Sequence, residues 1–206
     1  MSDNKDFLKK VSELFLDNGA KTLTMDDIAK EFSISKKTLY QQYKNKEELL
    51  EAVLEFKLNT IIENIHLIDN STDNAIEKMI LPEKDFENFS RTNKSLFIRQ
   101  LLKYYPAIFN QHIIINMNQK ISKLLILNVE NGREQGLYRN DFDEKLYIKF
   151  FLQIMLSYES SPLFEDEEID RECFCFEAVM FYLHSIATDK GKLFLKKIKY
   201  QEDKNI

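Results

Sequence analysis

The chain has 206 residues and a formal net charge of −5, and 44% of its residues are hydrophobic, 31% charged and 12% aromatic. This balance excludes a disordered chain; four glycines and three prolines are too few for the frequent turns of an all-β fold, and two cysteines cannot form a disulfide framework. Because polar residues interrupt every long apolar stretch and the N-terminus is polar, we expect a cytoplasmic protein with neither a membrane span nor a signal peptide.

Helical patterns occupy nearly the whole chain, which predicts an all-α protein. An apolar face over residues 7–15 predicts the first helix, and Gly19 follows its expected end. Thr24 is a suitable N-cap for a second, short helix that ends near Phe32. Two acidic residues in its first turn favour the positive end of the helix dipole.

A third short helix and a long fourth one follow. Residues 33–35 predict a tight turn, and residues 36–42 the third helix. Asn45 is a suitable N-cap for the fourth helix, with Glu48 at the capping-box position, and the apolar pattern continues to about Ile68.

The middle of the chain predicts two more helices. Pro82 and Pro106 are expected to mark boundaries, and the apolar residues between them indicate one helix. Another runs from about Ala107 to Gly132, and the segment from Gly132 to Asp143 is expected to be a loop.

The last two predicted helices are apolar around most of their circumference. Asp141 to Glu144 is expected to cap the first, and Glu165 to start the second, whose apolar residues step by four and three as in a coiled coil. A homodimer joined through a four-helix bundle would bury both helices; the alternative is that the chain's own helices cover them. The residues expected at this dimer interface are Phe151, Ile154, Ile169, Cys173, Phe176, Met180 and Leu183.

The net charge conceals a basic window. Residues 30–46 contain five lysines and one acidic residue, whereas residues 1–50 as a whole are neutral. A compact basic patch on an acidic protein fits the phosphate backbone of a nucleic acid. The alternative is a solvated surface without a partner.

Two short helices joined by a tight turn predict a helix-turn-helix motif over about residues 24–43. In such motifs the second helix enters the major groove, where Lys and Gln side chains bond base edges, while hydroxyls and lysines around it bond phosphates. The predicted DNA-binding residues are Thr24, Ser35, Lys36, Lys37, Thr38, Tyr40, Gln41, Tyr43, Lys44 and Lys46.

The residues of this motif resemble the DNA-binding region of TetR/AcrR-type bacterial transcriptional regulators. The Ile28-Ala29 pair, the run from Ser35 to Tyr40 and the Lys-Glu-Glu-Leu start of the following helix match in order and spacing. Ser33 stands where the family often has Gly, and a left-handed backbone there would strain it.

The resemblance implies a helix-turn-helix DNA-binding domain over residues 1–48 and a larger helical effector-binding and dimerisation domain over residues 49–206. It also implies a homodimeric repressor on double-stranded DNA, which leaves a palindromic operator when an unidentified small, often apolar effector tilts the connecting helix. Side chains expected to line the effector pocket are Phe97, Leu101, Tyr104, Tyr105, Phe109, Phe150, Met155 and Tyr158, and the alternative for each is a place in the core.

The sequence gives little support to a metal site or a disulfide. Glu63 and His66 have the Glu-x-x-His spacing of di-iron bundles, but the required second pair is absent from the sequence. Cys173 and Cys175 match no common zinc spacing and cannot pair with each other, which predicts buried structural thiols, with redox sensing as the alternative.

No phosphate loop, nucleophile elbow or paired acid and base occurs in the sequence, so we expect no enzyme, no metal and no cofactor. Two alternatives to a ligand-released repressor stay open. One is a DNA-binding dimer without a small-molecule effector. The other is an all-helical interaction or scaffold protein that has lost DNA binding.

Overall fold

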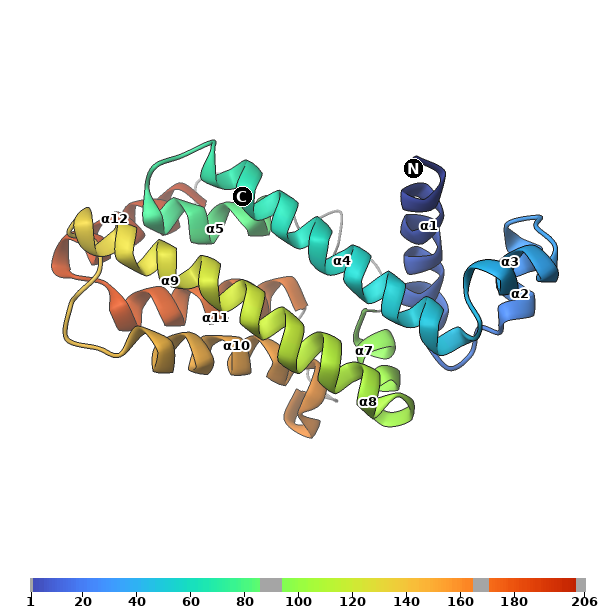
Figure 1. The fold of residues 1–206 in the computed structure, drawn as a ribbon. Coiled ribbons are helices and arrows are strands. Elements are labelled where there is room, and N and C mark those ends of the chain that lie inside the picture. Colours follow the sequence, from blue (N-terminus) through green and yellow to red (C-terminus); the bar gives the residue numbers. More distant parts are fainter. Residues whose placement is uncertain (1, 86–93, 165–170, 203–206) are drawn as a thin grey trace. The chain divides into compact units, whose positions relative to one another are not determined.

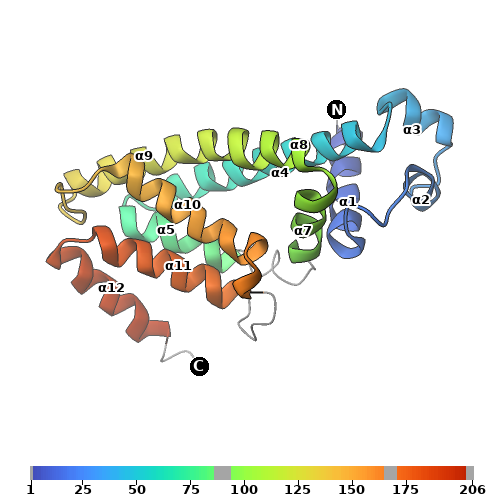
Figure 2. The same cartoon turned by 90° about the horizontal axis from the view of Figure 1, so that it is seen from below.

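The structure is a computed structural model that describes residues 2–85, 94–164 and 171–202 (Figures 1 and 2). Within these ranges the chain is helical nearly throughout and has no strand, which confirms the all-α prediction; Tyr138 and Ala187 form an isolated antiparallel bridge. No helix in the described ranges combines the length and apolarity that crossing a membrane requires.

The chain forms two compact units. Unit 1 contains Met1–Glu63 and Arg91–Asn118, and unit 2 contains Asn64–Ser90 and Gln119–Ile206. The long helix α4 (Lys46–Asp69) contributes to both units. Unit 1 therefore combines the N-terminal helices with a segment that lies much later in the sequence.

Unit 1 is built around the contact between α1 and α7. The ring of Phe15 on α1 stacks on that of Phe97 on α7 with centroids 6.0 Å apart, and both side chains are buried. Leu49, Leu50 and Leu101 are also fully buried in this unit. Its elements are α1 (Ser2–Asn18), α2 (Met25–Glu31), α3 (Lys36–Gln42), the first part of α4, α7 (Lys94–Tyr104), α8 (Pro106–Phe109) and a π-helical segment Asn110–Met117.

Unit 2 has its own hydrophobic core. Ile76, Tyr138, Ile148, Leu183 and Leu195 are almost inaccessible to solvent there. In both views α10 and α11 lie side by side, and α11 also packs against α5. The elements are the end of α4, α5 (Ala75–Asp85), α9 (Asn118–Glu134), α10 (Glu144–Ser160), a short 3-10 turn Pro162–Phe164, α11 (Arg171–Ile186) and α12 (Asp189–Glu202).

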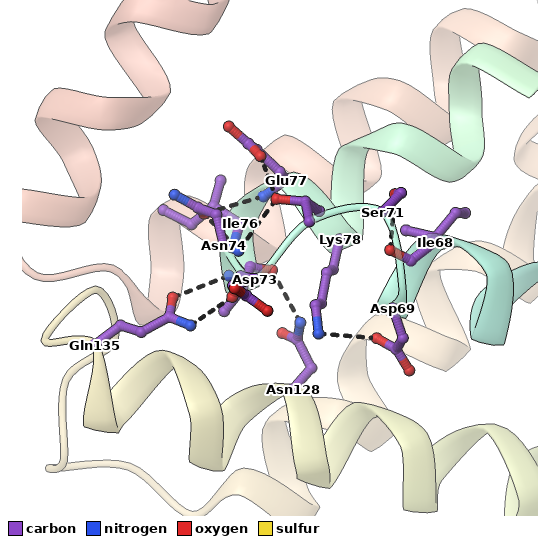
Figure 3. Close-up of polar contacts among 12 residues, drawn as sticks. Ile68, Asp69, Ser71, Asp73, Asn74, Ile76, Glu77, Lys78, Asn128 and Gln135 are labelled. Carbon is purple, nitrogen blue, oxygen red and sulfur yellow. Dashed lines mark hydrogen bonds and ion pairs between the residues drawn. The ribbon is translucent and has the colours of Figure 1, made fainter.

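Polar contacts hold the turn between α4 and α5 against α9 (Figure 3). Nδ2 of Asn128 donates to the carbonyl of Ala75 at 2.9 Å, and Nε2 of Gln135 donates to the carbonyl of Asp73 at 2.6 Å. The Ala75 N–H donates to Oε1 of Gln135 at 3.0 Å. The Ala75 N–H is one of the groups that the start of α5 leaves without an intrahelical partner, and Gln135 satisfies it.

Several predicted boundaries after α4 are wrong. Pro82 lies inside α5 and does not mark its end. The segment predicted as one helix from Ala107 to Gly132 consists of α8, the π-helical segment and α9 in succession. It begins at Pro106 and ends at Glu134. Gly132 is required there for close packing and not for a turn, because a Cβ at this position would lie 2.0 Å from Cδ2 of Tyr138.

The predicted helix starts near residues 141 and 165 also need correction. Asp143 alone is the N-cap of α10, and its carboxylate accepts from two backbone N–H groups, while Glu144 forms an ion pair with Arg133 at 3.1 Å. Glu165 lies outside the described residues, and α11 is described from Arg171. A separate helix, α12, follows α11 and has no counterpart in the prediction.

Candidate nucleic-acid interface

Helix α2 begins at the predicted cap, Thr24. The hydroxyl of Thr24 accepts from the N–H of Asp27 at 3.2 Å, and the carboxylate of Asp27 accepts from the N–H of Thr24 at 3.0 Å, which completes a capping box. The hydrogen bonds from Thr24 lower the pKa of Asp27. The cap is therefore formed by a Thr-Asp pair that is fixed before any partner binds.

The turn between α2 and α3 passes through Ser33 in the left-handed conformation, with φ of +52°. This confirms the expected backbone strain, since a non-glycine residue pays for its Cβ there. The N–H of Ile34 donates to the carbonyl of Ala29 at 3.0 Å and closes the turn. The predicted limits of the third helix, Lys36 and Gln42, are those of α3.

Helix α3 buries one side chain and exposes all the others. Leu39 is its only buried residue and is fully covered. Tyr40 is 46% exposed, and Oγ of Ser35 accepts from the N–H of Thr38 at 3.0 Å as the N-cap. The exposed side chains are those of Lys36, Lys37, Thr38, Tyr40, Gln41 and Gln42. A helix held by one anchor presents most of its circumference to a partner.

Three of the predicted DNA-binding residues in and next to α3 already have side-chain partners within the protein. The ammonium of Lys36 pairs with the carboxylate of Asp26 on α2, and this bond raises the pKa of Lys36. The hydroxyls of Ser35 and Thr38 lie 2.7 Å apart and bond to each other. Lys37, Gln41 and Gln42 carry the longest exposed side chains of α3 without a described polar contact.

The structure contradicts the predicted phosphate contact of Tyr43. Its side chain is 8% exposed, its hydroxyl donates to Oδ1 of Asn4 at 3.2 Å, and its ring stacks on Phe7 with centroids 6.1 Å apart. Burial raises the pKa of the Tyr43 phenol. Tyr43 therefore packs the end of the helix-turn-helix motif against α1, since both Asn4 and Phe7 belong to that helix.

Asn45 caps the start of α4 as predicted, but the reciprocal bond from Glu48 has a different partner. Oδ1 of Asn45 accepts from the N–H of Glu48 at 2.8 Å, as expected. The carboxylate of Glu48 accepts from the N–H of Lys44 at 2.6 Å, one residue before the cap. Nζ of Lys46 donates to the carbonyl of Lys21 at 3.1 Å, and partial burial lowers the pKa of Lys46.

Lys21 is a residue that the sequence reasoning missed. It precedes the basic window of residues 30–46, and only the contact from Lys46 places it beside the start of α4. Its backbone N–H donates to Oε1 of Gln100 on α7 at 2.6 Å. No local sequence signal could have revealed this bond, because 79 residues separate the two partners.

The residues predicted for an effector pocket are divided between the two units. In unit 1, Phe97, Leu101 and Phe109 are buried, whereas Tyr104 is 41% exposed. In unit 2, Phe150 is 55% exposed. Tyr104 and Phe150 are surface residues of their units, and this corrects their prediction as pocket linings. The remaining three, Tyr105, Met155 and Tyr158, are partly buried.

Five of the seven residues predicted for the dimer interface are buried or partly buried in unit 2. Met180 is 5% exposed and Leu183 is fully buried, so neither is available to a partner in this structure. Phe181, one residue after Met180, is 66% exposed. Phe151 is buried, Ile154 and Phe176 are partly buried, Cys173 is exposed, and Ile169 lies outside the described residues. The exposure of Cys173 contradicts the prediction of two buried thiols.

An apolar groove of about 240 Å³ runs between α10 and α11. Phe150 and Phe181 are its most exposed walls, and Phe151, Ile154 and Tyr182 complete its apolar lining. The side chains that point outward from α11 are those of Cys173, Glu177, Phe181 and His184. These outward-facing residues lie next to the residues predicted for the dimer interface, and Cys173 belongs to both sets.

Among the described residues, no three His, Cys, Asp or Glu side chains lie close enough together to hold a metal ion. Glu63, half of the Glu-x-x-His pair, forms an ion pair with Lys5 at 3.5 Å. Both residues are mostly exposed, and this contact joins α4 to α1 within unit 1.

Comparison with known sequences places the match on the same segment. The sequence model of the tetR family of bacterial regulatory proteins matches residues 8–53. The chain is 24% identical over 194 residues to an HTH-type transcriptional regulator of Staphylococcus aureus, covering 91% of this chain and 94% of that protein. It is 25% identical over 151 residues to the HTH-type transcriptional repressor KstR2 of Mycolicibacterium smegmatis, covering 72% of this chain and 74% of the repressor.

Solved structures share the fold over nearly the whole chain. The ketosteroid transcriptional regulator KstR2 of Mycobacterium tuberculosis matches with a TM-score of 0.60 and 20% identity, over 89% of this chain and 94% of that one. FadR of Bacillus subtilis, in complex with stearoyl-CoA, matches at 0.66 and 18% identity, over 87% and 97%. A regulator of Saccharomonospora viridis in complex with choline matches at 0.70 and 15%, over 91% and 100%.

Proposed function

The chain belongs to the TetR family of bacterial regulatory proteins, and from this we propose that it is a homodimeric repressor that a small apolar ligand releases from a palindromic DNA operator. Residues 1–48 are the proposed DNA-binding domain, and residues 49–206 the proposed effector-binding and dimerisation domain. The observation that carries the proposal is the single buried anchor of α3, Leu39, which leaves the rest of that helix free to enter a major groove.

Base recognition is assigned to the exposed side chains of α3. Lys37 has the length and charge to reach O6 and N7 of guanine, and Gln41 can pair with adenine through two hydrogen bonds. Tyr40 and Thr38 are exposed beside them and supply hydroxyls. The ammonium of Lys36 is paired with the carboxylate of Asp26, which offsets part of the attraction of Lys36 for the negative charge of DNA.

Phosphate contacts are assigned to the helix starts around α3. Thr24 and Lys44 are exposed, and the ammonium of Lys46 uses one of its three hydrogens on the carbonyl of Lys21. The other two hydrogens of Lys46 can bond a phosphate oxygen without breaking that bond. Such contacts fix the position of the protein on the duplex and carry no sequence information themselves.

Dimerisation is assigned to the outer faces of α10 and α11. The exposed rings of Phe150 and Phe181, with the groove between them, form an apolar surface that water covers in the monomer. Burying such rings is the usual source of stability in a homodimer interface. Two recognition helices about 34–36 Å apart would then fit successive major grooves on one side of the duplex.

Release by an apolar ligand is supported by relatives and by composition. FadR of Bacillus subtilis was solved with stearoyl-CoA, which shows that a protein of this fold can hold a long apolar chain. The aromatic and aliphatic side chains of α7 and α8, including Phe97, Leu101 and Phe109, are candidates for such contacts. A ligand acts only by the difference in its affinity for the two conformations.

The first test is selection of duplexes from a random DNA library at physiological salt. We expect enrichment of a palindrome, and loss of that enrichment in Gln41→Ala. The control is Lys123→Ala, which removes an exposed lysine of α9 and should select the same palindrome as the wild-type protein. Selection of an asymmetric site would contradict the dimeric arrangement, and no selection at all would contradict sequence-specific binding. Native mass spectrometry of the purified protein then tests for a bound apolar molecule.

A further inference from the structure

A cluster of lysines and tyrosines lies in unit 1 outside the helix-turn-helix. Nζ of Lys21 lies 4.2 Å from the ring centroid of Tyr104, and Nζ of Lys103 lies 5.4 Å from the same centroid. Nζ of Lys46 lies 5.9 Å from the ring centroid of Tyr105 and donates to the carbonyl of Lys21. Three ammonium groups from three different segments therefore meet at two adjacent phenol rings.

The cluster is held in place by the packing of α7. The N–H of Lys21 donates to Oε1 of Gln100 at 2.6 Å, so the loop after α1 is tied to the middle of α7. Gly19, at φ of +82°, lies directly beneath the amide of Gln100, where a Cβ would come within 2.6 Å of that amide. A larger residue at position 19 would push Gln100 away, so the glycine permits this bond. The backbone of Lys21 is thus held by Gln100 on one side and by the ammonium of Lys46 on the other.

The ammonium groups of the cluster form no ion pair among the described residues. Among those residues, neither Lys21, Lys46 nor Lys103 forms an ion pair, although the protein as a whole carries a net charge of −5. The carboxylates that act on Lys46 are those of Glu47 and Asp27, and Asp27 is already bonded to Thr24. Repulsion between neighbouring ammonium groups is relieved when an anion lies between them.

The cluster also adjoins the proposed phosphate contacts. Lys46 belongs to both groups, and Lys21 lies three residues before Thr24, the cap of α2. Lys21, Lys103 and Tyr104 are exposed, so their ammonium groups and hydroxyl are accessible. A basic surface that continues from a helix-turn-helix motif is complementary to the continuous line of phosphates along a duplex.

We infer that Lys21, Lys103 and Tyr104 form a second DNA contact surface that binds phosphates next to the half-site read by α3. This inference rests on the proposed function, because it assigns a further part of the same DNA interface. It places the end of α7, which the sequence assigns to the effector domain, in contact with DNA. The bound group is a backbone phosphate, so the contact adds affinity without reading bases.

The experiment measures the affinity for duplex DNA as a function of salt concentration. Fluorescence anisotropy is recorded for one short duplex that carries only the selected site and one with about ten further base pairs on each side. Loss of one phosphate contact should reduce the slope of log affinity against log salt by about 0.9. Between 50 and 200 mM salt, this corresponds to a change of about three-fold in the ratio of affinities.

We expect Lys103→Ala to lose this much slope on the long duplex, Lys103→Arg to retain the wild-type slope, and Lys123→Ala to behave as the wild-type protein. Lys21→Ala should repeat the loss, and circular dichroism should show that each variant is folded. A wild-type slope for both alanine variants on the long duplex would overturn the inference and identify the cluster as a solvated surface.

Failure of the inference and failure of the proposed function have different signatures. If Gln41→Ala loses sequence selection while Lys103→Ala and Lys21→Ala bind as the wild-type protein does, the repressor proposal stands and the second surface is excluded. If the wild-type protein selects no sequence, the same salt titration is run on a duplex of arbitrary sequence. On that duplex, a wild-type slope of log affinity against log salt for Lys103→Ala and Lys21→Ala overturns the inference, and a reduced slope supports it.

Discussion

Helices α3 and α11 differ in what determines which of their side chains are buried: the local sequence pattern in α3, and packing against other helices in α11. Helix α3 has seven residues and buries only Leu39, whereas α11 has sixteen and buries six. The exposed face of α3 consists of polar residues, so the sequence pattern alone identifies its anchor. Helix α11 is apolar on most sides, and only packing against α5 and α10 decides that Met180 faces inward and Phe181 outward. A motif defined by short-range spacing is therefore easier to predict than an interface defined by an apolar surface.

Neighbouring residues of α11 allow the largest test of this difference. Met180→Glu would place a carboxylate in the core of unit 2, which costs several kcal/mol unless it is protonated or paired, so we expect loss of the folded state. Phe181→Glu changes a side chain that is 66% exposed and should instead yield folded monomers. Circular dichroism and light scattering separate the two outcomes. A folded monomer from Met180→Glu would show that Met180 lies in the dimer interface, as predicted from the sequence.

The corresponding pair on α3 is Leu39 and Gln42. Leu39→Ala removes the only buried side chain of the helix and should lower the free energy of unfolding by about 2–5 kcal/mol. Gln42→Ala, at an exposed position, should change it by less than about 0.5 kcal/mol. Urea denaturation measures both. Equal effects of the two substitutions would contradict the single-anchor description of α3.

Lys57 on α4 extends the comparison to a charged side chain that the fold covers. Burial lowers its pKa to about 8 from 10.5, although Glu13 acts in the opposite direction. The unfolded chain therefore binds more protons than the folded protein between pH 8 and 10.5. The free energy of unfolding should accordingly rise with pH in this window, by on the order of 2 kcal/mol.

The control for Lys57 is Lys57→Met, whose unbranched side chain is one atom shorter and does not titrate. The difference in stability between the two proteins, measured by urea denaturation from pH 7.5 to 10.5, cancels the contribution of other groups. A difference that does not change with pH would show that the Lys57 ammonium is hydrated in the folded protein.

The smallest expected effect concerns the turn before α3. Ser33→Gly removes the strain of a left-handed serine and should stabilise the protein, by about 1 kcal/mol, reduced by the greater flexibility of glycine in the unfolded chain. Ser33→Ala has the same strain as serine and serves as the control. Thermal unfolding measures the difference, and equal stability of the glycine and alanine variants would argue against strain at this position.

Contacts within a few residues made the helix-turn-helix predictable. The cap at Thr24, the cap at Ser35 and the limits of α3 depend on residues at most four positions apart, so residue type and spacing determine them. The burial of Tyr43 was not predictable, because it depends on Asn4 and Phe7. The same limit applies to Lys21, which a bond from Lys46 places beside the start of α4.

The sequence by itself determined the helical class of the described chain, the motif around α3 and the resemblance of that motif to the TetR family, since these depend on periodicity and short-range spacing. The tertiary structure alone decided that Gly132 supports Tyr138, that Met180 is buried and Phe181 exposed, and that Lys21 and Tyr104 share one surface. The physical reason is that an apolar or basic side chain can satisfy its chemistry in several places. The choice among them depends on neighbours that are distant in the sequence.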